Sequence, residues 1–199
     1  MSWIRTADES EPAVAALFER DRAQLGYVAN YTTVFAHRPD VYEAWRALNG
    51  AVKAAMDPRR YELATVAAAL RLRSSYCALA HGKVLAEQLD SADAVRDIVA
   101  AEPAGAALSE LDRAVLRLAD KVAAGASRMS EEDLAELRAL GLPDEEILDV
   151  VLAAAARCFF STVLDAVGAE PDATFADLPQ PLREALTVGR PIERVQPVG

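Results

Sequence analysis

Apolar residues recur along most of the chain at intervals of three and four, the spacing that places side chains on one face of an α-helix. One such stripe has four members: Leu63, Val66, Ala67 and Leu70. Asp57-Pro58 precedes it and supplies a capping residue followed by a proline suited to a first turn. No stretch shows the alternation of apolar and polar residues typical of a half-buried strand. The pattern therefore predicts an all-α fold.

The second half of the chain repeats this pattern. A second stripe has four members: Leu111, Val115, Leu118 and Val122. It follows a Ser-x-x-Asp sequence at 109–112, which is typical of a helix start, and the same sequence at 130–133 predicts a short helix ending near 141–143. Residues 144–167 are apolar on much of their circumference, and Gly168 suits a helix end. Such a helix lies centrally in a fold or in an oligomer interface.

The two ends of the chain differ in composition. We expect helices near 11–24 and 39–53 in the first part. The tail that begins at Pro171 holds five of the ten prolines, at 171, 179, 181, 191 and 197. We expect it to wrap a neighbour or lie on the surface, with one short helix near 179–187.

A chain of 199 residues is long enough for one domain with a substantial core. We expect an N-terminal helical extension over residues 1–38, a helical domain over residues 39–170 and a proline-rich tail over residues 171–199.

The charge balance limits the classes of partner that the chain is expected to bind. The formal net charge is −10, so we expect neither a nucleic acid nor a membrane as a partner, because both normally require a basic face. The first fifteen residues are polar and acidic, without the apolar segment of a secretion signal, and no apolar run reaches the length of a membrane span. These features predict a cytoplasmic protein.

The residues that bind metals and phosphates are sparse. The nine glycines form no phosphate-binding loop, and two histidines, His37 and His81, are too few for a typical zinc site without thiolates. We therefore expect no metal and no cofactor. Two cysteines, Cys77 and Cys158, do not suggest a disulfide framework.

One group of three residues could support thiol chemistry. Glu62 precedes Cys77 by fifteen residues, and His81 follows Cys77 by four, so the thiol and the imidazole share a helix face. If a helix begins at Ser74 or Ser75, Cys77 lies in its first turn, where free N–H groups favour the thiolate. The thiolate is the form that attacks a peroxide or a disulfide.

A purely structural interpretation of the same residues is open. An isolated cysteine in a helical protein is most often a small buried apolar residue. A lone histidine is most often a surface residue or a hydrogen-bonded core residue. Glu62 stands near a predicted helix start, where a negative charge is favourable without any further role.

The order of these residues resembles the carboxymuconolactone decarboxylase-like superfamily, and within it the alkyl hydroperoxidase D-like, peroxidase-related branch. The pattern of that family is Glu, then a Cys-x-x-Cys twelve residues on, then His four residues after the second Cys. Glu62, position 74, Cys77 and His81 reproduce this spacing. The Tyr-Cys-x-x-x-His-Gly sequence of residues 76–82 is similar to that of the peroxidase-related members. The sequence from Phe159-Phe160 to Gly168-x-Glu170-Pro171-Asp172 is similar to the closing helix, so the resemblance covers roughly residues 40–175.

The resemblance implies an all-α, AhpD-like domain of antiparallel helices that assembles into a homo-oligomer, a trimer or a hexamer. It also implies site residues. Cys77 would be the thiol that meets a hydroperoxide, with His81 and Glu62 as its proton relay. Tyr76 stands where family members often carry a polar ring, and Ser74 stands in place of the first cysteine of the motif.

Ser74 is a departure from the family pattern. A serine can donate a hydrogen bond to a thiolate, but it cannot form a disulfide with Cys77. Oxidised Cys77 would need another thiol to resolve it. Cys158 is the only other one in the chain, and its place on an apolar helix favours core packing. We therefore expect the reductant to be a small thiol or a redox protein.

Three functions stay open. The first is a thiol-dependent alkyl hydroperoxidase that uses Cys77, His81 and Glu62. The second is a cofactor-free decarboxylase or isomerase acting on a small acidic metabolite, in which His81 and Glu62 would be the acid and the base. The third is a non-catalytic oligomer whose pocket binds a ligand.

Overall fold

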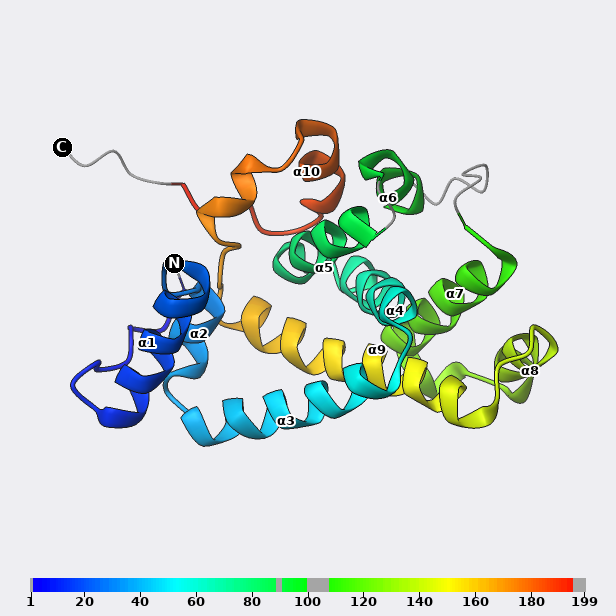
Figure 1. The fold of residues 1–199 in the computed structure, drawn as a ribbon, viewed down its shortest axis with the longest axis horizontal. Helices are drawn as coiled ribbons and strands as arrows, with labels where there is room; N and C mark the ends of the chain where they lie inside the picture. Colours follow the sequence, from blue (N-terminus) through cyan, green and yellow to red (C-terminus); the bar gives the residue numbers. More distant parts are fainter. Residues whose placement is uncertain (1, 89–90, 100–107, 195–199) are drawn as a thin grey trace.

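The computed structural model describes residues 2–88, 91–99 and 108–194, and every regular element in these ranges is helical (Figure 1). The predicted all-α class is confirmed. The elements in chain order are α1 (Pro12–Leu25), α2 (Asn30–Phe35), α3 (Pro39–Ala55), α4 (Pro58–Arg71), α5 (Ser75–Gln88), α6 (Ala92–Val99), α7 (Glu110–Gly125), η1 (Ala126–Arg128), α8 (Glu131–Ala139), α9 (Asp144–Ala166), η2 (Ala173–Asp177) and α10 (Gln180–Leu186).

Local sequence signals account for where the helices begin. The carboxylate of Asp57 accepts a hydrogen bond from the backbone N–H of Arg60 at 2.9 Å, which caps α4 as the sequence predicts. Ser109 and Asp112 form a reciprocal capping box at the start of α7, with bonds of 3.0 and 2.9 Å. The end of α9 is followed by Gly168, whose φ of 73° lies in the left-handed region that glycine adopts without strain.

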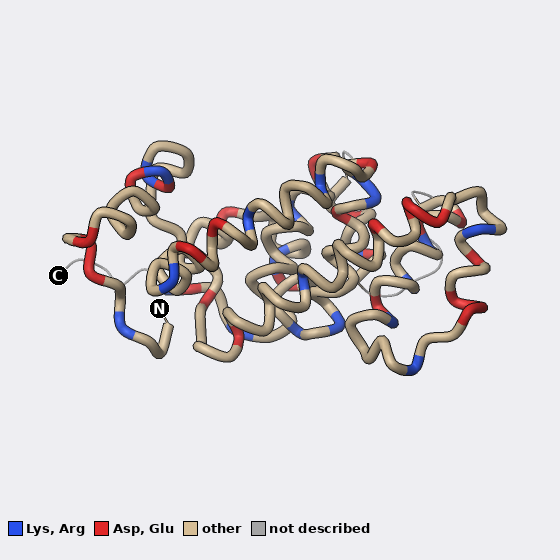
Figure 2. Tube along the Cα trace, turned by 90° about the horizontal axis from the view of Figure 1, so that it is seen from below, with Lys and Arg blue, Asp and Glu red and all other residues tan. Residues whose placement is uncertain are grey.

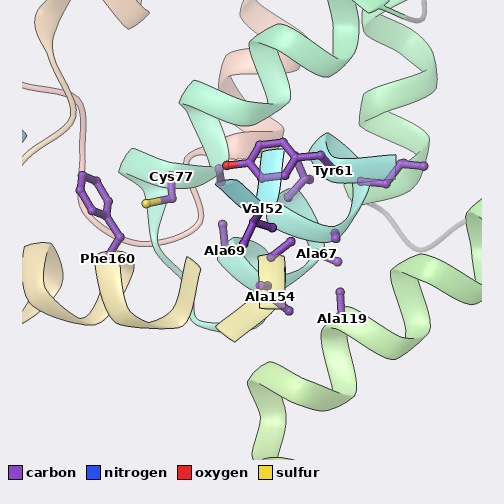
Figure 3. Packing of buried hydrophobic residues seen from close by; sticks show 14 of the residues in the cluster. Val52, Tyr61, Ala67, Ala69, Cys77, Ala119, Ala154 and Phe160 are labelled. Carbon is purple, nitrogen blue, oxygen red and sulfur yellow. The ribbon is translucent and has the colours of Figure 1, made fainter. Parts of the chain in front are cut away.

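Helix α4 is the centre of the fold. It packs against α5, α7 and α9, which surround it (Figure 1). The sequence pattern predicts one buried face, yet every residue from Tyr61 to Ala69 is buried. Small side chains make this possible, because Ala67 and Ala69 let the neighbouring helices approach closely, and Figure 3 shows them among alanines of α7 and α9.

Helix α9 is the long helix that the sequence predicts, and α3 lies along it. By length and composition it is the one helix in the described part of the chain that could cross a bilayer, and half of its most apolar window is buried inside the fold. Its outer face leaves Leu148, Leu152 and Phe159 exposed. Acidic and basic positions are interspersed along the trace as a whole (Figure 2).

The two ends of the chain pack onto the same molecule. Val14 and Phe18 of α1 belong to the main hydrophobic core. After α10, the backbone N–H of Gly189 donates to the hydroxyl of Ser75 at 2.7 Å, so the tail returns to the start of α5. The short helix expected near 179–187 is confirmed as α10, whereas Pro197 lies outside the described residues. The three-part division of the chain stays a prediction.

Helices α2 and α6 have no counterpart in the sequence expectations. They are six and eight residues long, too short to show several repeats of a helical pattern. Their place is set by contacts with longer helices, α2 with α1 and α3, and α6 with α5 and α10.

Candidate active site

The turn between α4 and α5 brings the predicted site residues together. Arg73 adopts a φ of 56°, a left-handed conformation that is uncommon for a residue with a side chain, and it reverses the chain before α5. Helix α5 then begins at Ser75, as one of the two expected starts, and Cys77 lies in its first turn. The reversal lays α5 against α4, so His81 faces back towards Glu62.

Glu62 and His81 form a direct pair. Nδ1 of His81 lies 2.7 Å from Oε2 of Glu62, and the glutamate is only 1% exposed. Nζ of Lys53 lies 3.7 Å from the other oxygen of the same carboxylate. A buried carboxylate requires such partners, because desolvation of an unpaired charge costs several kcal/mol. Glu62 is therefore more than a favourable charge near a helix start.

The surroundings of His81 favour the neutral imidazole. Burial lowers the pKa of His81 to about 4, and the positive charge of Arg157 adds to this effect, whereas Glu62 opposes it. When a neutral imidazole donates its Nδ1–H to a carboxylate, Nε2 keeps a free lone pair. His81 is thus uncharged near neutral pH, and Glu62 fixes the orientation of its ring.

Cys77 has a cationic partner from a distant part of the chain. Nη1 of Arg157, on α9, lies 3.5 Å from the sulfur of Cys77. Cys77 is 1% exposed and Arg157 is 3% exposed, so both are shielded from solvent. Burial disfavours the charge on Arg157, but Cys77 and Tyr61 raise its pKa above the ordinary value. A guanidinium at this distance favours negative charge on the sulfur.

Sequence reasoning missed Arg157. Its signal is a charged residue inside the apolar run of α9, directly after four alanines at 153–156. A cation in such a run is costly unless it has a partner or a role. In the described part of the chain no carboxylate forms an ion pair with it, and its polar neighbours are the thiol of Cys77 and the hydroxyl of Tyr61.

A cavity of about 320 Å³ opens beside Cys77 and His81. Its aromatic lining comes from α2, α3, α4, α5 and α9: Tyr31, Tyr42, Trp45, Tyr61, Tyr76 and Phe160. Three cations also line it: Arg46, Lys53 and Arg157. Figure 3 shows the sulfur of Cys77 directed towards the side of Phe160. Cys77 therefore borders this cavity, although only 1% of the residue is exposed to solvent.

Tyr76 lines the cavity with its ring, but its hydroxyl is engaged elsewhere. The hydroxyl donates to Oδ2 of Asp172 at 2.5 Å and accepts from the backbone N–H of Tyr31 at 3.3 Å. Burial raises the pKa of Tyr76 well above its ordinary value. Tyr76 thus joins α5 to α2 and to the segment after α9.

Ser74 lies outside the cavity. Its hydroxyl is fully buried and has no hydrogen-bond partner of normal geometry among the described residues, although it lies near enough to Asp165 to influence the pKa of that carboxyl. Ser74 occupies the position of the first cysteine of the motif, but it is not among the described residues that line the cavity beside Cys77. A disulfide at this position is chemically impossible.

Cys158 is a second free thiol in different surroundings. It is partly buried, burial raises its pKa, and it is not among the described residues that line the cavity. Among the described residues, no group of three or more His, Cys, Asp or Glu side chains is placed to hold a metal ion. The cavity presents the thiol of Cys77, the imidazole of His81 and the guanidinium of Arg157.

Comparisons with known proteins agree with this arrangement. Residues 39–121 match the model of the carboxymuconolactone decarboxylase family, a range that contains Glu62, Cys77 and His81. No curated protein sequence matches the chain.

Solved structures extend the likeness to most of the chain. An uncharacterized peroxidase-related protein from Ralstonia eutropha JMP134, described as an alkylhydroperoxidase AhpD core, has a TM-score of 0.76 at 23% identity and covers 87% of this chain and 94% of its own. A peroxidase-related protein from Silicibacter sp. TM1040 has a TM-score of 0.74 at 21% identity, with 86% and 91% covered.

A third similar structure has a different activity in its name. It is a cysteine-to-alanine variant of the debrominase Bmp8 in complex with 2,3,4-tribromopyrrole, with a TM-score of 0.72 at 16% identity, covering 90% of this chain and 95% of its own. At these identities the likeness establishes the fold alone, which is the AhpD-like helical fold.

Proposed function

We propose that the chain, which matches the carboxymuconolactone decarboxylase family over residues 39–121, is a thiol-dependent hydroperoxidase with Cys77 as its nucleophile. The observation that carries this proposal is the environment of the sulfur. Cys77 lies at a cavity wall with the guanidinium of Arg157 at 3.5 Å, and the same cavity holds a neutral His81 fixed by Glu62. A cation beside a thiol favours the thiolate, and a neighbouring base activates the thiol as a nucleophile.

The reaction begins with loss of the thiol proton. Nε2 of His81 accepts this proton, and Arg157 stabilises the resulting thiolate. The sulfur attacks the distal oxygen of the hydroperoxide, so an S–O bond forms and the O–O bond breaks. The leaving alkoxide takes a proton from the imidazolium of His81. The products are an alcohol and a sulfenic acid at Cys77, with sulfur oxidised by two electrons and the peroxide reduced.

The cycle closes with an external reductant. One thiol condenses with the sulfenic acid, releases water and leaves a mixed disulfide. A second thiol attacks that disulfide and releases Cys77 in its reduced form. Ser74 has no thiol and cannot supply either of these two groups, and Cys158 is not among the described residues that line the cavity. A small thiol or a redox protein is therefore the reductant that we propose.

Trapping of the sulfenic acid tests the proposal directly. The purified protein is treated with cumene hydroperoxide and then with dimedone, and the modified residue is located by mass spectrometry. We expect an adduct on Cys77 in the wild type and in Cys158→Ser, and none in Cys77→Ser. Absence of both peroxide consumption and the adduct in the wild type would overturn the proposal.

The Glu62–His81 pair also favours a second candidate, acid–base chemistry on a small acidic metabolite without a cofactor. The cations in the cavity suit an acidic substrate. In that case Cys77 would only line the cavity, so Cys77→Ser would keep turnover whereas His81→Ala would abolish it. A thiol that is inert towards hydroperoxides, with no turnover of any kind, would leave the non-catalytic ligand-binding function.

A further inference from the structure

We propose that the cavity at Cys77 selects a flat aromatic molecule that carries a negative charge, a carboxylate, at the end remote from the thiol. The inference rests on the proposed function, because it places the hydroperoxide group of that molecule at Cys77. It adds the chemical class of the rest of the substrate. Three independent features of the cavity carry it.

The first feature is the flat apolar surface. The rings of Trp45 and Phe160 stack with centroids 4.2 Å apart, and Trp45 and Tyr42 are nearly parallel, with an interplanar angle of 5°. Aromatics make up only 6% of the chain, yet six of them line this one cavity. Aromatic surfaces bind planar rings more favourably than saturated ones, through stacked or edge-to-face contacts.

The second feature is the charge of the lining. None of the described residues that line the cavity is Asp or Glu, although the chain has 31 acidic and 21 basic residues. Arg157 is buried at the sulfur, whereas Arg46 and Lys53 have side chains that are 39% and 54% exposed. The cations thus run from the thiol to the solvent side. A cavity with charges of one sign concentrates the field and attracts an anion.

The third feature is the open face of α3. Arg46, Asn49, Gly50 and Lys53 recur at helical spacing and all line the cavity. A methyl group added at Gly50 would have no atom within 4 Å, so no packing contact requires a glycine there. Glycine weakens a helix interior. Gly50 therefore places no side chain between the two exposed cations.

The existing partners of these cations leave them available. Arg46 pairs with Glu43 at 3.2 Å, and both side chains are exposed, so the pair is weak and easily exchanged. Lys53 lies 3.7 Å from Glu62, and its exposed ammonium has three N–H donors, so it can keep this ion pair and still contact a ligand. A ligand carboxylate can therefore bind Arg46 and Lys53 while the ring lies against Trp45 and the reactive group reaches Cys77.

Binding of unreactive product analogues tests the inference without any turnover. The probes are para-carboxy cumyl alcohol, its para-carboxamide and the cyclohexane analogue of the acid, titrated by calorimetry into the wild-type chain. We expect the aromatic acid to bind about ten-fold more tightly than the amide, because a charge-assisted contact is lost, and more tightly than the saturated acid. Equal affinities for acid and amide, or no binding of the acid, would overturn the inference.

A matched pair of variants locates the charge effect. Arg46→Gln removes a cation from the cavity. It should weaken binding of the acid several-fold, because one charge-assisted hydrogen bond to the carboxylate is lost. Binding of the amide should change little. Arg38→Gln is the control, because Arg38 pairs with Asp40 on the surface and does not line the cavity. An equal loss in both variants would show a general charge effect and contradict the site.

The two proposals can fail separately. Sulfenate trapping with cumene hydroperoxide, which has no charge, tests only the thiol chemistry. If the acid binds selectively and Cys77 yields no adduct, the hydroperoxidase proposal fails and the ligand class stands. If Cys77 is oxidised but the acid and amide bind equally, the ligand class fails and the hydroperoxidase proposal stands.

Discussion

The two cysteines of this protein have different surroundings, although Arg157 is close to both. The sulfur of Cys77 lies 3.5 Å from the guanidinium and borders a cavity that also holds His81. Cys158 follows Arg157 in the chain and is partly buried, but it does not line that cavity, and burial raises its pKa. Both thiols are at least partly buried, so the features that distinguish Cys77 are the cavity and the guanidinium and imidazole that line it. Where a buried thiol has a cation, a base and room for a small molecule, it becomes a candidate nucleophile.

Replacement of each cysteine gives the largest expected contrast. Cys77→Ser should reduce hydroperoxide turnover by about a thousand-fold or more, because the nucleophile itself is lost. Cys158→Ser should leave turnover within about two-fold if Cys158 only packs. A coupled assay with excess dithiothreitol measures both. Loss of turnover in Cys158→Ser would mean that this thiol resolves oxidised Cys77.

Arg157→Met removes the positive charge but keeps a long, unbranched side chain, so it tests the charge apart from the packing. The rate of sulfenate formation should fall by about ten- to a hundred-fold, because a charged hydrogen bond to the thiolate is lost. The free energy of unfolding should stay the same or rise, since a buried arginine without a carboxylate partner is costly. Ultraviolet thiolate absorbance and urea unfolding are the measurements. An unchanged rate would remove Arg157 from the mechanism.

His81 gives the protein a defined pH dependence. Its pKa is about 4 in the folded protein against an ordinary value of 6.5, so the unfolded chain binds the additional proton between these values. This contribution to the free energy of unfolding, about 3 kcal/mol, is fully present above pH 6.5 and is lost as the pH falls towards 4.

Urea unfolding at several pH values tests this assignment. His81→Gln should flatten the decrease in stability between pH 6.5 and 4, whereas Cys158→Ser should keep it. In the wild type, the rate of Cys77 oxidation should hold down to about pH 4 and fall below it, because His81 then loses its role as a base. A fall in the rate near pH 6.5, the ordinary pKa of histidine, would contradict an imidazole that is partly buried and neutral.

The smallest effects are expected at Gly50. Gly50→Ala should raise the free energy of unfolding by about 0.5–1 kcal/mol, because glycine weakens a helix interior and the added methyl group meets no atom. Gly50→Leu should narrow the cavity and slow alkylation of Cys77 several-fold, by steric exclusion, without slowing that of Cys158. Alkylation rates resolved by mass spectrometry provide the test. Equal slowing at both thiols would show a change in the fold instead.

Two expectations, one from the resemblance and one from the composition, stay predictions. One is the homo-oligomer, a trimer or a hexamer, for which the exposed apolar residues of α9 are a physical reason. The other is the cytoplasmic location.

Much of the fold follows from local sequence. The capping residues at 57 and at 109–112 and the glycine at 168 determine where α4, α7 and α9 begin or end. The four-residue separation of Cys77 and His81 puts both on one helix face, and a serine at position 74 excludes a disulfide within the motif. These are properties of neighbouring residues, so the chain determines them without reference to distant parts.

Only the tertiary structure decided what surrounds the thiol. Arg157 stands eighty residues after Cys77, and Lys53 and Trp45 come from α3, which precedes the motif. Their meeting at one cavity depends on how α3 and α9 cross the α4–α5 pair and on the rotation of each helix about its axis. Side-chain packing over the whole core determines these quantities. The periodicity of a single helix contains no such information, which is why the residues of the motif were foreseen and the cation beside the thiol was not.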